Sequence, residues 1–186
     1  MTIKRTLRIL AVALTVACLC GATALAADSI TEEDTQAVID YSQMDNETAV
    51  YTYLTREMGL SSAAACGVLA NIEYESGFDP TVWGDGGTSH GLCQWHSGRC
   101  TALSRFCREN DYDEDSVYGQ MAYLRYELET GYPDVLAYLQ SVEDSAQGAY
   151  DAAWYWCYYF EIPAQRDVQA NLRGECAYQQ YSIEQG

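Results

Sequence analysis

Cations are scarce in this sequence. Its 186 residues contain 10 lysines and arginines against 27 aspartates and glutamates, which gives a net charge of −17 at pH 7. Lysine occurs once, at Lys4. Nucleic acids and anionic membrane surfaces are usually bound through basic patches. The composition therefore argues against both of them as partners.

The apolar run at residues 9–26 is interrupted by threonine, cysteine and glycine, and it lacks a charged stop-transfer flank. It follows three cations and ends in Ala-Leu-Ala, an order typical of a secretory signal peptide. We therefore expect a signal peptide at 1–26 rather than a membrane anchor, and a secreted, extracellular or cell-wall-associated product. A lipoprotein signal around Cys18 stays open. Cleavage would leave seven cations against the same 27 acids, a net charge of −20.

The rest of the chain divides by composition. Residues 27–46 are acidic with few apolar side chains, which is typical of a solvated linker. Residues 47–186 are long enough for one domain with a sizeable core. Amphipathic patterns recur through this part, and about seven helices with little sheet are expected. One helix is predicted over residues 61–75, and a short strand over 91–95.

Six cysteines would remain after cleavage. An even number in an exported chain suggests disulfides. Two alternatives stay open: reduced cysteines packed in a helical core, and a zinc site. The residues available for zinc do not match an established spacing, so no metal or other cofactor is expected. The six are Cys66, Cys93, Cys100, Cys107, Cys157 and Cys176.

Three blocks of sequence resemble the phage tail lysozyme family, a branch of the lysozyme-like group that includes goose-type lysozymes and lytic transglycosylases. Residues 71–80 (Asn-Ile-x-x-Glu-Ser-Gly-Phe-Asp-Pro) look like its Glu-Ser motif, and residues 84–96 (Gly-Asp-Gly-Gly-Thr-Ser-x-Gly-Leu-Cys-Gln-Trp-His) look like its Gly-Leu-x-Gln motif. Residues 146–153, followed by Phe-Glu-x-Pro at 160–163, are similar to its C-terminal signature. The resemblance covers roughly residues 48–180. It implies a mainly α, lysozyme-like (α+β) fold, with one helical domain and a small loop and strand region beside the active-site groove.

The resemblance also implies that Glu75 acts as general acid and then as general base. Glycosidic cleavage needs a carboxyl that keeps a proton, which partial burial favours. Asp85, in the Gly-rich loop, is the candidate for a second catalytic group, although a turn residue is as good an interpretation. Thr88 and His90 are candidates to orient water or sugar. Ser76 is expected to support Glu75.

Further residues are candidates for holding the glycan. Gln94 matches a motif position that contacts substrate or steadies the acid, unless it is a hydrogen-bonded core amide. Aromatic faces bind pyranose rings, and Trp95 is one candidate platform, although such side chains are more often core. The family resemblance suggests that a tyrosine of the aromatic-rich helix at 146–161 faces the catalytic glutamate, and Tyr155 is the candidate.

Together these features predict a monomeric peptidoglycan hydrolase that binds a glycan strand. It would cleave the bond between N-acetylmuramic acid and N-acetylglucosamine. Three alternatives are kept: a lytic transglycosylase with the same site, a non-catalytic wall-binding module, and a disulfide-linked structural protein.

Overall fold

A computed structural model describes residues 39–184 of the chain. The expected signal peptide (1–26) and residues 27–38 of the expected linker lie outside the described residues. Within 39–184 there are seven α-helices, one short 3-10 helix, two π-helical turns and a three-stranded antiparallel sheet. In chain order they are η1 (Tyr41–Gln43), α1 (Asn46–Thr52), η2 (Tyr53–Glu57), α2 (Ser62–Ser76), β1 (Trp83–Gly84), β2 (Ser89–His90), β3 (Trp95–His96), α3 (Gly98–Asn110), α4 (Val117–Gly131), α5 (Pro133–Ser141), α6 (Ala146–Trp156), η3 (Cys157–Glu161) and α7 (Arg166–Glu184).

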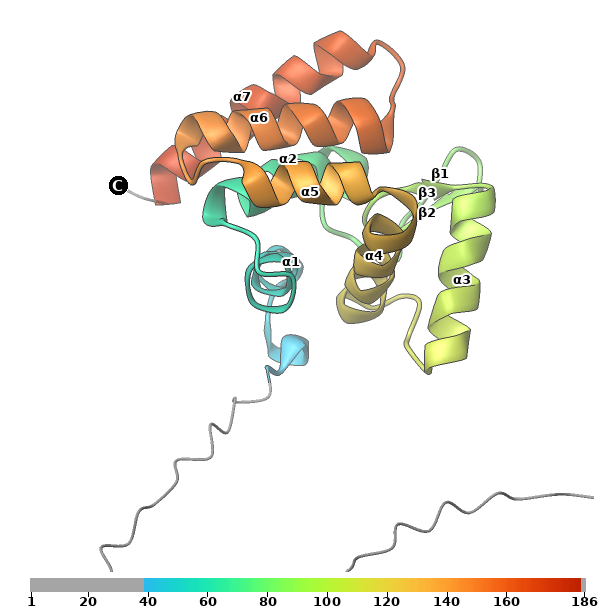
Figure 1. The fold of residues 1–186 in the computed structure, drawn as a ribbon. Coiled ribbons are helices and arrows are strands. Elements are labelled where there is room, and N and C mark those ends of the chain that lie inside the picture. Colours follow the sequence, from blue (N-terminus) through green and yellow to red (C-terminus); the bar gives the residue numbers. More distant parts are fainter. Residues whose placement is uncertain (1–38, 185–186) are drawn as a thin grey trace, which may run out of the picture. The chain divides into compact units, whose positions relative to one another are not determined.

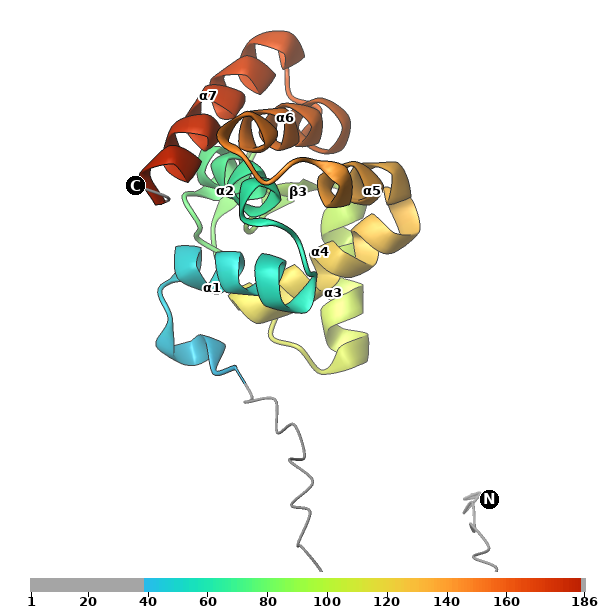
Figure 2. The same cartoon turned by 60° about the vertical axis from the view of Figure 1, so that its left-hand side comes forward.

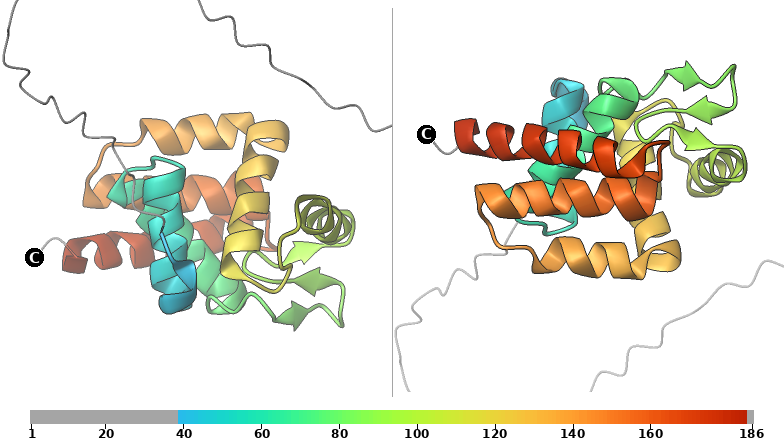
Figure 3. Two further views of the ribbon diagram at one scale, coloured as in Figure 1. Left: turned by 90° about the horizontal axis from the view of Figure 1, so that it is seen from below. Right: turned by 90° about the horizontal axis from the view of Figure 1, so that it is seen from above.

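The fold is mainly α and lysozyme-like, as predicted. Helices α6 and α7 lie side by side and both pack on α2 (Figures 1 and 3). Helix α1 packs on α2 and on α4, and α5 connects α4 to α6 (Figure 2). The Ser76 hydroxyl at the C-terminal end of α2 donates to the Leu92 backbone oxygen in the turn between β2 and β3, so this end of α2 lies against the sheet region. One helix therefore reaches from the core to the sheet.

Helix α2 has clear local signals at both ends. The Ser61 side chain accepts a hydrogen bond from the Ala64 amide at the N-terminus, which satisfies one of the amides that a helix start leaves unpaired. Gly77 ends the helix in the left-handed region (φ 60°), where glycine carries no steric penalty. Every residue from Ala63 to Ile72 is buried.

Helix α6 approaches α2 closely at a glycine. A Cβ atom built on Gly67 would lie 2.5 Å from the Ala152 Cβ and 2.7 Å from the Ala153 amide nitrogen. Such distances are shorter than side-chain contacts allow, so only glycine fits there. The close contact fixes the direction of α2, and thereby the place where its C-terminal turn meets the sheet.

The sheet differs from the prediction. The expected strand at 91–95 was wrong: β2 and β3 flank a turn at residues 91–94, with His90 paired to Trp95 and Ser89 paired to His96. Strand β1 pairs with β2 through Trp83 and His90. Strands of two residues are too short for an alternating pattern to identify.

The cysteine prediction also needs correction, because no disulfide joins two of the six cysteines in the described part of the chain. Five of the six are buried and Cys176 is partly buried. Burial raises the pKa of the Cys107 and Cys157 thiols to about 11, so both stay neutral near pH 7. The cysteines pack as small apolar side chains, which is one of the alternatives left open by the sequence.

Among the helices between residues 39 and 184, none is both long enough and apolar enough to span a membrane.

Candidate active site

Glu75 occupies the last turn of α2, directly before the glycine that ends the helix. Its side chain is 20% exposed, and its Oε1 atom lies 2.7 Å from Nη2 of Arg173 on α7. The carboxylate is therefore partly sheltered, accessible from solvent, and fixed in position by a charge-assisted contact.

Besides Glu75, two groups hold Arg173 in place. Its Nη1 donates to the Asn71 side-chain oxygen at 3.0 Å, and its guanidinium lies over the Tyr74 ring at 5.3 Å. The Asn71 amide in turn donates to the backbone oxygens of Gly67 and Ala153, at 2.9 and 3.1 Å. Asn71 thereby ties α2, α6 and the arginine of α7 together, and holds the arginine against Glu75. Because Arg173 is only 5% exposed, this orientation is set by packing rather than by solvent.

A second carboxyl of the site belongs to Glu161, at the end of η3. The Trp156 indole Nε1 donates to Glu161 Oε1 at 2.8 Å. Burial, and after it the negative charge of Glu75, raise the pKa of Glu161 to about 8, against the opposing effects of Trp156 and two arginines. Glu75 is therefore near enough to Glu161 for its charge to act on the Glu161 carboxyl. Glu161 therefore keeps its proton at neutral pH.

The two arginines near Glu161 are Arg99 and Arg173. Arg99, on α3, donates from Nε and Nη2 to the two carboxylate oxygens of Glu127, at 2.7 and 2.9 Å. Its guanidinium lies 4.4 Å from the centre of the Phe160 ring. This bidentate pair attaches α3 to α4 and places a fixed positive charge beside the end of η3.

Trp95 belongs to this buried network and not to the surface. It is fully buried, and its Nε1 donates to Glu127 Oε2 at 2.8 Å. The structure thus corrects the expectation that Trp95 offers a ring face to sugar. Its indole N–H finds a carboxylate partner inside the protein, which allows the whole ring to be buried.

Two of the predicted residues hold the motif loops in place. The Ser76 hydroxyl donates to the backbone oxygen of Leu92 at 3.0 Å, and so joins the end of α2 to the turn between β2 and β3. The Gln94 amide donates to the backbone oxygens of Gly91 and Val82, at 3.0 and 3.3 Å. Ser76 thus fixes the backbone next to Glu75, and Gln94 fixes the turn that Ser76 contacts.

Asp85 lies at the turn between β1 and β2 with φ 48°, and its side chain is 70% exposed. It accepts a hydrogen bond from the Ser89 hydroxyl at 2.6 Å, and its carboxylate lies 3.8 Å from His96 Nδ1. Thr88 donates to the Asp85 backbone oxygen at 3.0 Å. Asp85 therefore serves as a turn residue, and it also presents a carboxylate to solvent.

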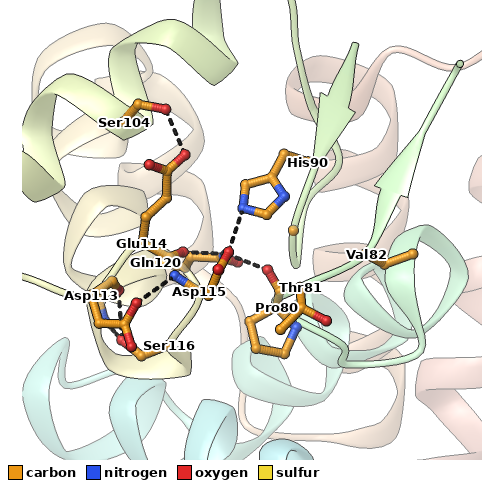
Figure 4. Close-up of polar contacts among 12 residues, drawn as sticks. Pro80, Thr81, Val82, His90, Ser104, Asp113, Glu114, Asp115, Ser116 and Gln120 are labelled. Atoms are coloured by element: carbon orange, nitrogen blue, oxygen red, sulfur yellow. Dashed lines mark hydrogen bonds and ion pairs between the residues drawn. The ribbon is translucent and has the colours of Figure 1, made fainter. Parts of the chain in front are cut away.

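His90 is fully buried, which corrects the expectation that it meets water or sugar in this structure. Its ring stacks on the exposed ring of Trp83 at 4.2 Å, and its Nε2 lies 3.3 Å from Asp115 (Figure 4).

Next to His90, the buried Gln120 amide donates to the backbone oxygens of Pro80 and Glu114, at 2.6 and 2.8 Å. It also accepts from the Leu92 amide at 2.8 Å. This one side chain joins three loops.

Tyr155, the tyrosine predicted to face the acid, lies in a row of aromatic rings. Its ring stacks on Tyr138 of α5 at 3.8 Å and contacts Tyr159 at 4.4 Å. The aromatic side chain of this helix that contacts a carboxylate of the site is Trp156. That carboxylate belongs to Glu161 and not to Glu75, so the expectation that Tyr155 faces Glu75 stays a prediction.

Arg173, Arg99 and Glu161 were missed from the sequence as site residues. The only available signal was Glu161, which stands within the Phe-Glu-x-Pro part of the C-terminal signature. The arginines carry no such signal, because their partners lie far away in the chain. Between residues 39 and 184, no group of three or more His, Cys, Asp or Glu side chains is arranged to hold a metal ion.

A helical domain with a small antiparallel sheet and a glutamate at the end of its central helix has the architecture of a lysozyme-like protein. The sequence profile of the phage tail lysozymes matches residues 45–183, so the chain belongs to the phage tail lysozyme family. This membership implies a glycosidase-like enzyme with peptidoglycan as its substrate. No curated protein matches the sequence significantly.

Proposed function

We propose that the protein is a secreted hydrolase that cleaves the bond between N-acetylmuramic acid and N-acetylglucosamine, with Glu75 as its general acid and base. The observation that carries this proposal is the Glu75–Arg173 contact at the end of α2. It gives the glutamate of the family motif a fixed position and partial shelter, while a fifth of its side chain remains exposed.

In the proposed reaction, the Glu75 carboxyl gives a proton to the glycosidic oxygen as the bond to the anomeric carbon breaks. A water molecule then adds its hydroxide to that carbon and returns a proton to Glu75. Since Arg173 contacts Oε1, we assign the proton transfer to Oε2. Glu75 regains its proton at the end of each cycle, so the proposed reaction needs no cofactor.

Asp85 is proposed to place the attacking water. Its carboxylate is exposed and held by the Ser89 hydroxyl, so it can accept a hydrogen bond from that water and orient it, while the proton of the water passes to Glu75. Asp85→Asn should slow wall digestion while leaving the hairpin intact. A variant that digests wall at the wild-type rate would limit Asp85 to its role in the turn.

The test is digestion of a bacterial wall suspension by the mature chain, followed through turbidity and mass spectrometry of the released fragments. The wild type should clear the suspension and Glu75→Gln should not. Glu73→Gln is the matched control, because Glu73 lies two residues away on the same helix and is exposed. Equal clearing by wild type and Glu75→Gln would refute the assignment of Glu75.

The products separate the alternatives. Hydrolysis leaves a reducing muramyl end, whereas a transglycosylase leaves an anhydro end that is lighter by one water. Binding of the wall without released fragments, by wild type and Glu75→Gln alike, would indicate a wall-binding module.

A further inference from the structure

The aromatic helix α6 changes its hydrogen-bond spacing just before Glu161. In η3 the Ile162 amide donates to the Cys157 oxygen at 3.0 Å, a π-helical spacing of five residues. Trp156 and Glu161 are also five residues apart, and their side chains are hydrogen-bonded. In a regular α-helix, residues five apart point about 140° away from each other. The π turn is therefore what brings the Glu161 carboxyl back over Trp156.

The chain leaves this turn through a strained residue. Ile162 adopts the left-handed region (φ 55°, ψ 49°), which is a genuine outlier for a β-branched side chain. Such strain persists only where the surrounding structure enforces it, and it concentrates at functional sites together with π turns. Ile162 itself is exposed, so burial of its side chain does not account for the strain. What the strained turn does fix is the position of its neighbour, Glu161.

Charged and titratable groups from several elements interact with Glu161, which itself raises the pKa of the two cysteines among them. They are Glu75 from α2, Arg99 from α3, Arg173 from α7 and the buried Cys93 from the β2–β3 turn, with Trp156 from α6 as hydrogen-bond donor. Cys157 belongs to η3 itself.

Both arginines already have a close carboxylate partner. Arg99 lies 2.7 Å from Glu127, and Arg173 lies 2.7 Å from Glu75. Glu161 is thus a third carboxyl beside two arginines, and its ionisation would leave one excess negative charge in the cluster.

We propose that Glu161 is a second functional carboxyl of this site, a positioning residue that the π turn η3 delivers to the Glu75–Arg173 ion pair. The proposal rests on the proposed function of Glu75. When Glu161 is protonated, it is neutral, and Arg173 stays paired with Glu75. Without its proton, it competes with Glu75 for Arg173 and loosens the contact that orients Glu75. Because the pKa of Glu161 is about 8, this competition sets the alkaline limit of the reaction.

The first test is the pH profile of wall digestion by the mature chain. From about pH 7 to about pH 9 the protonated fraction of a group with a pKa of about 8 falls about tenfold, and the wild-type kcat should fall with it. In Glu161→Gln, whose amide cannot ionise, this fall should disappear. The matched control is Glu129→Gln, which removes a half-exposed glutamate paired with Arg125 and should keep the wild-type profile.

Two results would overturn the proposal. One is a Glu161→Gln profile that falls in the same range as the wild type. The other is a folded Glu161→Gln protein that is inactive at every pH, because Glu161 would then be the proton donor itself. Circular dichroism of each variant shows whether it is folded.

The second test needs no substrate, and so separates this proposal from the proposed function. Carbon-13 NMR of glutamate side chains in the mature chain should show one carboxyl that titrates at about pH 8. That titration should vanish in Glu161→Gln. It should move to lower pH in Glu75→Gln, because a neighbouring negative charge is removed. The absence of any glutamate titration in this range would overturn the proposal even in an active enzyme. A wild type that releases no wall fragments would instead refute the proposed function.

Discussion

Arg173 Nη2 lies 2.7 Å from Glu75 Oε1, so a residue of the last helix positions the carboxylate at the end of the second. The two residues are brought together by the packing of α7 on α2. Asn71 sets the orientation of the arginine through its 3.0 Å hydrogen bond. The candidate site is therefore part of the helical core, and mutations that loosen this core should lower activity as well as stability.

Replacement of Arg173 should reduce catalysis strongly. Arg173→Met keeps much of the side-chain volume but removes the charge that holds Glu75, and misplacement of a catalytic group by about 1 Å costs about 100-fold in rate. We expect a fall in kcat of about that size in wall digestion. Arg173→Lys should be intermediate, because an ammonium cannot reproduce the planar contacts of the guanidinium to Glu75 and Asn71. Arg125→Met, which removes an exposed pair with Glu129, is the control and should retain the wild-type kcat. An unaltered kcat in folded Arg173→Met would contradict the positioning role.

Stability should depend on pH through Glu161. Its pKa is about 8 in the folded protein and about 4.5 as an unperturbed group, so the folded state binds more protons between these values. The free energy of unfolding should therefore fall as pH rises from about 4.5 to about 8. Because Glu161 is partly exposed, solvent screens part of this effect, and we expect a loss of about 2 kcal/mol. Denaturant unfolding at a series of pH values measures this slope. Glu161→Gln should flatten it, and an equally steep slope in that variant would assign the titration to another group.

Local signals in the sequence were sufficient to predict most helices but not the site. The prediction of a helix at 61–75 is confirmed by α2, because a serine cap and a glycine stop are local signals. The mainly α class followed from the same helix patterns, and the lysozyme-like fold from the family resemblance. The strands were missed because each has only two residues, and the loops around them are held by contacts distant in sequence, such as the hydrogen bonds of Gln120 to Leu92 and Pro80. Only the folded chain shows which aromatic rings are buried, as Trp95 illustrates.

The site itself combines one local and two non-local features. Glu75 stands in a contiguous motif, so its candidacy could be read directly from the sequence. Arg173 is separated from it by almost a hundred residues, and no periodicity relates the two. Glu161 is positioned by a π turn and a left-handed isoleucine, both of which depart from the backbone that its sequence favours.

Loss of the Gln120 side chain should separate the loops that carry the motif. Gln120→Leu has a similar size but leaves the Leu92 amide and the backbone oxygens of Pro80 and Glu114 without this partner. Buried groups left unsatisfied cost about 1–3 kcal/mol. We expect a loss of that order in the free energy of unfolding, and faster hydrogen exchange at the Leu92 amide. Gln140→Leu, at an exposed position of α5, is the control. Unchanged exchange at Leu92 would show that the turn is held by other contacts.

A methyl group at position 67 should separate α6 from α2. In Gly67→Ala the new Cβ would lie 2.7 Å from the Ala153 amide nitrogen, and the backbone there can only yield by moving the whole helix. Overpacking of this kind costs about 1–3 kcal/mol, which exceeds the gain of up to about 1 kcal/mol that alanine usually brings to a helix. The shift would also strain the hydrogen bond from Asn71 to Ala153, and through Asn71 the position of Arg173. Thermal unfolding and wall digestion should both show losses.

Gly131→Ala is the matched control for Gly67→Ala. It changes a helical glycine with no atom within 4 Å of the new methyl, and should be neutral or stabilising. Equal melting temperatures for the two variants would mean that α6 can move away from α2 at little cost, and the site would then be less rigid than its contacts indicate.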